Sequence, residues 1–237
     1  MLPLESTFEQ SGRWRRIYLD LPGATESPDQ AVGSSQEVAD AVVQTILAHI
    51  GREPFAVLGN SFGGMIARHV AHELRSQVLG LATLAGVFIA PHTERAVPPR
   101  TVLRQDSRIV PLLGAALELY RDDAVVESLD DARSFLQYVL PGLTGADQGA
   151  LDRISEKYSL SQEPEDAHSE PFLQPTLHIT GRQDNVVGYV DAWARVDHYP
   201  RASYATLDTA GHNILFEQRD LCSALVANWL ARIRHES

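Results

Sequence analysis

A serine in a glycine-rich segment has the surroundings of a nucleophile. Residues 59–64 read GNSFGG, so Ser61 has a glycine two positions before it and another two positions after it. The apolar run Pro54–Leu58 precedes this segment, and residues at helical spacing follow it at once. A tight strand-to-helix turn of this kind holds a serine hydroxyl out above the sheet, and the glycines let neighbouring backbone approach. The pattern therefore predicts that Ser61 is a nucleophile.

A serine hydroxyl at neutral pH needs a general base, and that base needs a third group to fix its tautomer. Two loops downstream supply these residue types, because Asp184 and His212 each follow the end of an expected strand. The carboxyl ends of parallel strands form the ligand crevices of open α/β sheets, so we expect both side chains near Ser61. Asp208 is a competing acid, which could instead form a hydrogen bond within its own loop.

Other polar patterns in the sequence do not indicate a cofactor. His69 and His72 lie beside Glu73 in the order His-x-x-His-Glu, which matches neither HExxH nor HxxEH, so we expect a solvated helix face. No Lys-Ser or Lys-Thr pair follows Gly64, and no GxGxxG segment follows an expected strand. We therefore expect no metal ion and no cofactor.

The alternation of strand and helix patterns predicts an α/β fold, with a mostly parallel sheet flanked by helices. Expected strands cover residues 14–20, 54–58, 78–87, 176–180 and 203–207, with helices over 34–51 and 62–74. Residues 89–170 are helical only, with expected helices over 112–120, 132–140 and 150–158 and a solvated acidic connection at 162–168. We interpret 89–170 as a helical cap and 1–88 with 171–237 as the core. Aromatic residues of this region, Tyr120, Phe135, Tyr138 and Tyr158, have the helical spacing of core residues.

The composition is that of an acidic globular protein. The chain has 237 residues, of which 44% are hydrophobic, and 20 basic against 31 acidic residues give a net charge of −11. This charge argues against a nucleic-acid partner. The sequence contains no run of 18 apolar residues, the length that would span a membrane. Its single cysteine, Cys222, can form no internal disulfide. We expect a cytoplasmic protein with a small-molecule substrate, and the oligomeric state is left open.

Four segments together resemble the signature segments of the α/β-hydrolase superfamily. They read DLPG at 20–23, GNSFGG at 59–64, GRQD at 181–184 and AGH at 210–212. The resemblance implies an α/β-hydrolase fold with a helical cap, a Ser61 nucleophile, a His212 general base and an Asp184 orienting acid. It also implies that the backbone N–H of Phe62 donates to the oxyanion. A serine rather than an aspartate at position 61 disfavours the dehalogenase and epoxide-hydrolase branches.

The GNSFGG form is similar to that of esterases and of carbon–carbon bond hydrolases. We therefore expect hydrolysis of small carboxylic esters or related carbonyl substrates through an acyl-enzyme. Two alternatives remain open: hydrolysis of a carbon–carbon bond in a ring-cleavage diketone, and a hydrolase-fold protein that binds a ligand or partner without turnover.

The resemblance also implies segments that this sequence lacks. Family members have three more strands ahead of the Trp14 strand, the third ending in a His-Gly segment with a second oxyanion donor. We expect an N-terminally incomplete sheet, with unpaired backbone and apolar surface between residues 14–20 and 54–58. Either Met1 lies within a longer reading frame, or the chain is a fragment whose activity is reduced by the missing donor.

Overall fold

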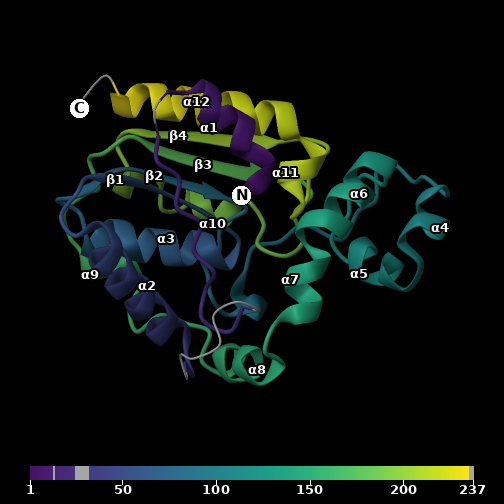
Figure 1. The fold of residues 1–237 in the computed structure, drawn as a ribbon, viewed down its shortest axis with the longest axis horizontal. Helices are drawn as coiled ribbons and strands as arrows, with labels where there is room; N and C mark the ends of the chain where they lie inside the picture. The colour runs from purple at the N-terminus through teal and green to yellow at the C-terminus, as the bar shows by residue number, and fades with distance from the viewer. Residues whose placement is uncertain (13, 25–31, 235–237) are drawn as a thin grey trace.

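A computed structural model describes residues 1–12, 14–24 and 32–234 (Figure 1). Within these residues, four parallel strands form one sheet in the order β1-β2-β3-β4. The strands are β1 (Phe55–Asn60), β2 (Val78–Leu84), β3 (Thr176–Gly181) and β4 (Ala202–Leu207). Four of the five predicted strands are therefore confirmed. Their continuous apolar runs suit strands that are covered by helices on both faces.

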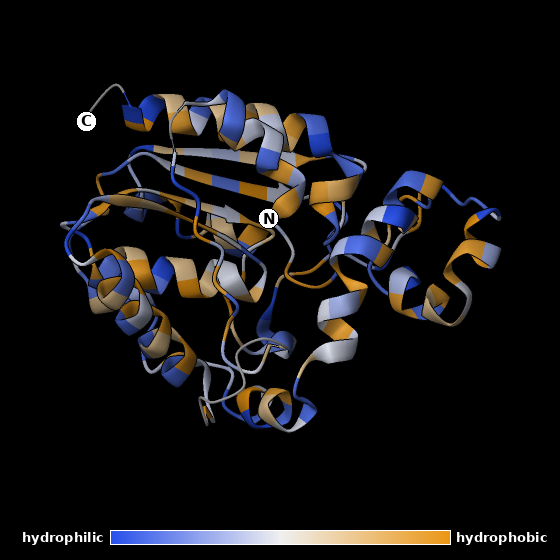
Figure 2. Ribbon diagram, in the orientation of Figure 1, coloured by the Kyte–Doolittle hydropathy of each residue, from blue (hydrophilic) through white to orange (hydrophobic). Residues whose placement is uncertain are grey.

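Helices cover the two faces of the sheet. Figure 1 shows α1 (Glu5–Gln10) and α12 (Arg219–Arg234) on one face, with α2 (Ser35–Ile50) and α3 (Phe62–Glu73) on the other. Half of the capping box predicted for α2 is present, because Ser34 Oγ accepts a hydrogen bond from the backbone N–H of Glu37 at 3.2 Å, whereas the Glu37 carboxylate accepts from the N–H of Gly33 rather than from that of Ser34. Figure 2 shows apolar residues along the strands and on the helix faces that are turned toward them. The shorter elements of the core are η1 (Leu2–Leu4), α10 (Val190–Trp193), η4 (Val196–His198) and α11 (Ile214–Glu217).

The chain between β2 and β3 is helical, as predicted, and we call residues 89–170 the insertion. Its elements are η2 (His92–Glu94), α4 (Ile109–Leu113), η3 (Gly114–Ala116), α5 (Leu117–Arg121), α6 (Leu129–Tyr138), α7 (Leu140–Gly145), α8 (Gln148–Glu156) and α9 (Pro164–Ala167). The single helix predicted over 112–120 is wrong, because Gly114 has φ +52° and ends α4. Helices α4 to α6 share a small core of their own, in which Tyr120 and Phe135 pack with ring centroids 5.5 Å apart.

Two expectations of solvated polar segments are corrected. Arg68 on α3 is 0% exposed, and its Nε donates to Glu165 Oε1 at 2.8 Å, so the acidic connection at 162–168 is anchored in the interior at Glu165, while Gln162, Asp166 and Ala167 are exposed. Burying a charge requires an opposite charge, and Glu165 supplies it. His72 is 2% exposed and its ring lies 4.9 Å from that of His198, so this part of the α3 surface is buried as well.

The strand predicted over 14–20 is wrong. Residues 15–20 are exposed, and no strand is assigned within the described segment 14–24. Arg16 Nε contacts Glu5 of α1 at 2.7 Å, and Tyr18 donates to the same carboxylate, so the segment is held by side chains rather than by a sheet ladder. Its β-favouring residues form no strand because a strand also needs a neighbouring main chain to pair with.

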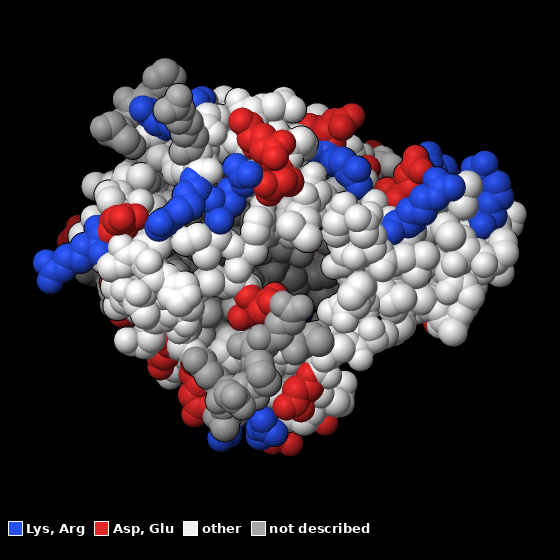
Figure 3. All heavy atoms as spheres, viewed as in Figure 1, with Lys and Arg blue, Asp and Glu red and all other residues white. Residues whose placement is uncertain are grey.

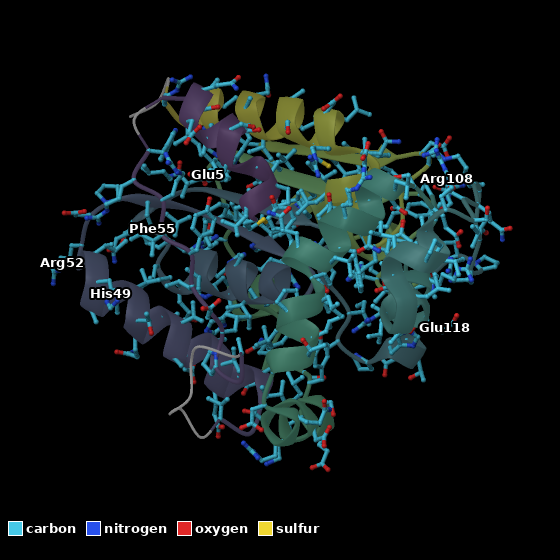
Figure 4. The ribbon with its side chains drawn as sticks, turned by 45° about the vertical axis from the view of Figure 1, so that its right-hand side comes forward. Glu5, His49, Arg52, Phe55, Arg108 and Glu118 are labelled. Carbon is cyan, nitrogen blue, oxygen red and sulfur yellow. The ribbon has the colours of Figure 1, made fainter. Side chains whose placement is uncertain are left out.

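The expected gap beside the 54–58 strand is present. β1 pairs with β2 on one side, and on its other side a cavity of about 710 Å³ separates it from residues 14–21. The backbone N–H of Phe55 donates to Gln77 O, just before β2, and the backbone N–H of Ser61 donates to Leu84 O, at the end of β2. Since strand residues alternate, Ala56 and Leu58 direct their main-chain groups into the cavity. Figure 4 labels two lining residues, His49 on α2 and Phe55 on β1.

On the face shown in Figure 3, Lys and Arg side chains lie among Asp and Glu side chains rather than in one patch. Within the part of the chain that the structure describes, every helix is too short or too polar to cross a membrane.

Candidate active site

The turn at Ser61 joins β1 directly to α3. Ser61 has φ +53°, an unfavourable conformation for a residue with a Cβ, which costs on the order of 1–3 kcal/mol and is typical of functional sites. The turn is fixed because Ser61 N donates to Leu84 O at 3.0 Å and Val87 N donates to Ser61 O at 3.2 Å. A Cβ on Gly59 would lie 2.0 Å from Gly63 O, so the turn requires glycine at that position. The strand–turn–helix context predicted for Ser61 is therefore confirmed.

Three predicted site residues form a continuous line of hydrogen bonds. His212 Nε2 lies 2.8 Å from Ser61 Oγ, and His212 Nδ1 lies 3.0 Å from Asp184 Oδ2. A carboxylate only accepts hydrogen bonds, so these partners assign the proton of the neutral imidazole to Nδ1 and leave Nε2 to accept from the serine hydroxyl. This is the arrangement in which an imidazole can remove the Ser61 proton.

Asp184 is fully buried and held by both of its carboxylate oxygens. Oδ2 faces His212, and Oδ1 accepts hydrogen bonds from Val186 N at 2.8 Å and Val187 N at 3.0 Å. The two backbone donors lie in the same loop, beyond the carboxyl end of β3. The carboxylate is therefore oriented independently of the histidine that it contacts.

The pKa of His212 is raised above its ordinary value of 6.5. Burial acts in the opposite direction and lowers the pKa, because the charged imidazolium loses hydration. The hydrogen bond and the charge of Asp184 outweigh burial, and the charge of Asp123 adds to them, while Arg95 lowers the pKa. The charges of Asp184 and Asp123 thus both favour the protonated form of His212.

The competing acid, Asp208, is engaged elsewhere. Its Oδ1 accepts a hydrogen bond from Gln183 Nε2 at 2.8 Å, and Gln183 Oε1 in turn accepts from Ala210 N at 3.1 Å. These bonds connect the loops that carry Asp184 and His212. Within its own loop, as the sequence allowed, Asp208 Oδ2 accepts a hydrogen bond from Thr209 Oγ1 at 3.3 Å, and Asp184 is the carboxylate beside the imidazole.

Phe62 is the first residue of α3, so its backbone N–H has no acceptor within the helix and points from the helix N-terminus. Its ring lies 5.4 Å from that of Tyr158, which comes from the insertion. Arg95, also in the insertion, donates to Ile89 O and Ala90 O at 2.8 Å and to Val186 O at 2.9 Å. Tyr158 and Arg95 thus hold the insertion against the start of α3 and against the loop that carries Asp184.

Sequence reasoning missed Arg95 and Glu217. Arg95 binds backbone carbonyls, which leave no residue pattern in a sequence. Glu217 accepts from the backbone beside His212 and could have been suspected only from its place five residues after the histidine. Across residues 1–12, 14–24 and 32–234, no group of three or more His, Cys, Asp and Glu side chains is arranged to hold a metal ion.

Comparisons with known proteins agree with this fold. A family model described as alpha/beta hydrolase fold matches residues 3–218. The pimeloyl-acyl-carrier-protein methyl ester esterase of Shewanella woodyi is 24% identical over 241 residues, which cover 96% of this chain and 87% of that protein. The crystal structure of an α/β-superfamily hydrolase from Oenococcus oeni PSU-1 has a TM-score of 0.89 at 24% identity and covers 97% and 86% of the two chains.

A more distant structure is similar over most of its length. The 2-hydroxy-6-oxo-6-phenylhexa-2,4-dienoate hydrolase of Rhodococcus sp. strain RHA1 has a TM-score of 0.62 at 19% identity, covering 86% of this chain and 74% of that chain. At these identities, the solved structures indicate a shared fold rather than a shared substrate.

Proposed function

Because this chain belongs to the α/β-hydrolase fold family, we propose that it is a serine hydrolase of small carboxylic esters. The observation that carries the proposal is the line of hydrogen bonds from Ser61 through His212 to Asp184, with lengths of 2.8 and 3.0 Å. Three residues far apart in the sequence meet at the carboxyl ends of three strands, and nothing in the packing of the core requires them to meet. An esterase among its relatives supports the ester as substrate.

Acylation begins with proton transfer. As Ser61 Oγ attacks the ester carbonyl carbon, its proton passes to His212 Nε2, and the carbonyl oxygen takes the negative charge. The backbone N–H of Phe62 donates to that oxyanion, and Asp184 stabilises the imidazolium. His212 then gives the proton to the alkoxide as the carbon–oxygen bond breaks. The alcohol leaves, and the acyl group remains on Ser61.

Deacylation repeats these proton movements with water. His212 Nε2 removes a proton from the water as its oxygen attacks the acyl carbon, and the proton then returns to Ser61 Oγ as the acyl–oxygen bond breaks. The products are the free acid and the regenerated serine. One ester and one water thus give one acid and one alcohol, without a cofactor.

We further propose that residues 89–170 act as the cap that selects the substrate, with 1–88 and 171–237 as the catalytic core. The support for this division is the contact of Tyr158 with Phe62, which brings the insertion beside Ser61. The Shewanella woodyi relative is named for a methyl ester, so an ester of a small alcohol is the first substrate to test.

A fluorophosphonate probe tests the proposal, because it reacts covalently with an activated serine. We expect it to label the wild-type protein and the Ser155→Ala variant, whose exposed serine lies on α8, but not the Ser61→Ala variant. Hydrolysis is then measured with methyl esters and with p-nitrophenyl esters of increasing acyl length. Labelling of Ser61 without ester hydrolysis would favour hydrolysis of a carbon–carbon bond. Absence of label at Ser61 would favour a protein that binds a ligand or partner without turnover.

A further inference from the structure

A single carboxylate connects the histidine loop to the insertion. Glu217 lies at the end of α11, and its Oε2 accepts a hydrogen bond from Gly211 N at 2.6 Å. Its Oε1 accepts from Val125 N at 2.7 Å and from Val126 N at 3.1 Å. Gly211 directly precedes His212, whereas Val125 and Val126 belong to the insertion. Removing this carboxylate would therefore leave backbone donors without a partner on both sides of the junction.

The two segments are also in close contact around this carboxylate. A Cβ added to Gly211 would lie 2.6 Å from Val125 Cγ2 and 3.1 Å from Asp123 O, so the insertion backbone lies directly against the loop. Val125 is completely buried. Its carbonyl oxygen accepts from Leu103 N at 2.8 Å, which ties residues 123–126 to the rest of the insertion.

The contact brings a second carboxylate into the surroundings of the catalytic histidine. Asp123 is half-buried, and its charge acts on His212 together with the charge of Asp184. The other charged group that faces His212 is Arg95. Asp123 itself is faced by Asp122 and Arg100 as well as by the site, and Glu217 is faced by Asp131. The position of residues 123–126 therefore sets how much the charge of Asp123 adds to that of Asp184 beside the imidazole.

We propose that Glu217 is a positioning residue for His212, whose carboxylate holds residues 123–126 against the histidine loop so that Asp123 helps Asp184 to stabilise the imidazolium. This role rests on the proposed function, because it treats His212 as the general base. It differs from a purely structural role, since it predicts a change in the ionisation of His212 as well as a change in rate.

The Glu217→Gln variant tests this proposal. The amide keeps one oxygen to accept hydrogen bonds, but its NH₂ cannot accept, so the backbone donors on one side of the junction lose their partner. We expect kcat for a p-nitrophenyl ester to fall about tenfold, with KM changed less than about twofold, because the lost interaction aligns the reacting groups rather than the substrate. The acid limb of the kcat/KM profile should move to lower pH.

Asp123→Asn separates position from charge. Removing this negative charge should lower the pKa of His212 and move the acid limb in the same direction, with a smaller effect on kcat. If Glu217 acts by placing Asp123, the double variant shifts no further than the larger of the two single variants. If Glu217 acts through its own charge, the two shifts add, and the proposal is overturned.

Glu127→Gln is the matched control. Glu127 is a buried carboxylate of the same insertion, but its side chain pairs with Arg121 and accepts from Asp106 N, which both belong to the insertion rather than to the histidine loop. We expect the acid limb of the kcat/KM profile of Glu127→Gln to stay at the pH of the wild-type protein. Thermal unfolding of each variant identifies any that does not fold. If Glu217→Gln does not fold, Asp123→Asn, at a half-buried position, still tests whether the charge of Asp123 raises the pKa of His212.

An NMR titration of the His212 imidazole measures the same pKa without turnover. It therefore tests the inference even in a protein that hydrolyses none of the esters, so failure of the proposed function and failure of this inference are distinguishable. The expected result is a pKa below the wild-type value in both single variants. An unchanged pKa in Glu217→Gln, in a folded protein, would remove Glu217 from the site.

Discussion

Asp184 is a residue of the site whose orientation is fixed by more than its contact with His212. Its Oδ1 accepts from two backbone N–H groups, and its Oδ2 is left for His212 Nδ1. Rotation of the carboxylate would break all of these bonds at a fully buried position, where unpaired polar groups are costly. The side chain is thus fixed in the orientation that selects the histidine tautomer.

We expect Asp184→Asn to reduce kcat by about 10³–10⁴-fold, because an amide in this position can donate to Nδ1 and stabilise the wrong tautomer of His212. The matched comparison is Asp208→Asn, which removes a carboxylate that bonds Gln183 and should retain most of the activity. Ester hydrolysis by both variants, with fluorophosphonate labelling of Ser61, measures the effect. A larger loss in Asp208→Asn would transfer the orienting role to Asp208.

The pH dependence of kcat/KM follows from the raised pKa of His212. His212 must be neutral to accept the Ser61 proton, so activity is lost as the pH falls through this pKa and the imidazole becomes charged. Since the pKa lies above the ordinary 6.5, the midpoint of the acid limb should lie above pH 6.5. Rates measured between pH 5 and 9 in buffers of constant ionic strength test this, and a midpoint below 6.5 would contradict it.

At the residue scale, the sequence predicts the functional residues that belong to a motif of fixed spacing. Ser61, Asp184 and His212 were identified because each stands at a fixed place beside a strand end, and the structure brings their side chains together. Arg68 was missed because its partner is a buried acid 97 residues away in the sequence. Glu217 was missed because its partners are backbone N–H groups. Neither kind of partner produces a local pattern.

At the scale of elements, α3 and α9 are joined by an ion pair that is shielded from water. Arg68 binds Glu165, which also accepts a hydrogen bond from Tyr199, and its guanidinium lies 4.2 Å from the centre of the Phe88 ring. Burial alone raises the pKa of Glu165, but the charge and hydrogen bonds of Arg68 outweigh it and hold that pKa below its usual value. The connection from the insertion back to β3 is thereby fixed to the helix that follows Ser61.

Breaking this pair from one side should be strongly destabilising. Arg68→Met leaves the Glu165 charge buried without its cation, and we expect a loss of about 3–5 kcal/mol in the free energy of unfolding. The double variant Arg68→Met/Glu165→Gln removes that lone charge and should recover part of the loss. Urea unfolding followed by circular dichroism measures both. A double variant less stable than Arg68→Met would show that the charge is not the cause.

Element prediction succeeded where the pattern alone decides the structure and failed where a neighbour decides it. The apolar runs of β1 to β4 are strands because helices cover them on both faces. Residues 14–20 are also rich in β-favouring residues, but the structure assigns them no strand pairing. The helix expected over 112–120 is divided at Gly114, where a positive φ ends α4.

At the scale of the whole molecule, one side of the sheet is open. β1 is an edge strand next to the cavity of about 710 Å³, although its residues Phe55–Leu58 are apolar or small, like those of a strand with two neighbours. An edge of this kind has unpaired backbone donors and acceptors, which water reaches through the cavity.

Hydrogen exchange should reveal this edge as an alternation along β1. The N–H groups of Val57 and Gly59 point toward β2, whereas those of Ala56 and Leu58 point into the cavity. We expect faster exchange at Ala56 and Leu58 than at Val57 and Gly59, since only the latter pair is bonded within the sheet. Residue-resolved NMR exchange rates test this pattern. Equal protection at all four positions would mean that a main chain pairs with the open edge in solution.

The connection between β2 and β3 has a consequence for the order of folding. Asn60 and Leu84 on β1 and β2 are 24 residues apart, and Thr180 and Thr206 on β3 and β4 are 26 apart. Thr83 and His178, which link β2 to β3, are 95 apart, so closing that loop costs about 1.2 kcal/mol more in chain entropy. Two local strand pairs should therefore form before they join. Ser61 belongs to the first pair, and Asp184 and His212 belong to the second, so the return of enzymatic activity during refolding would report the final association step.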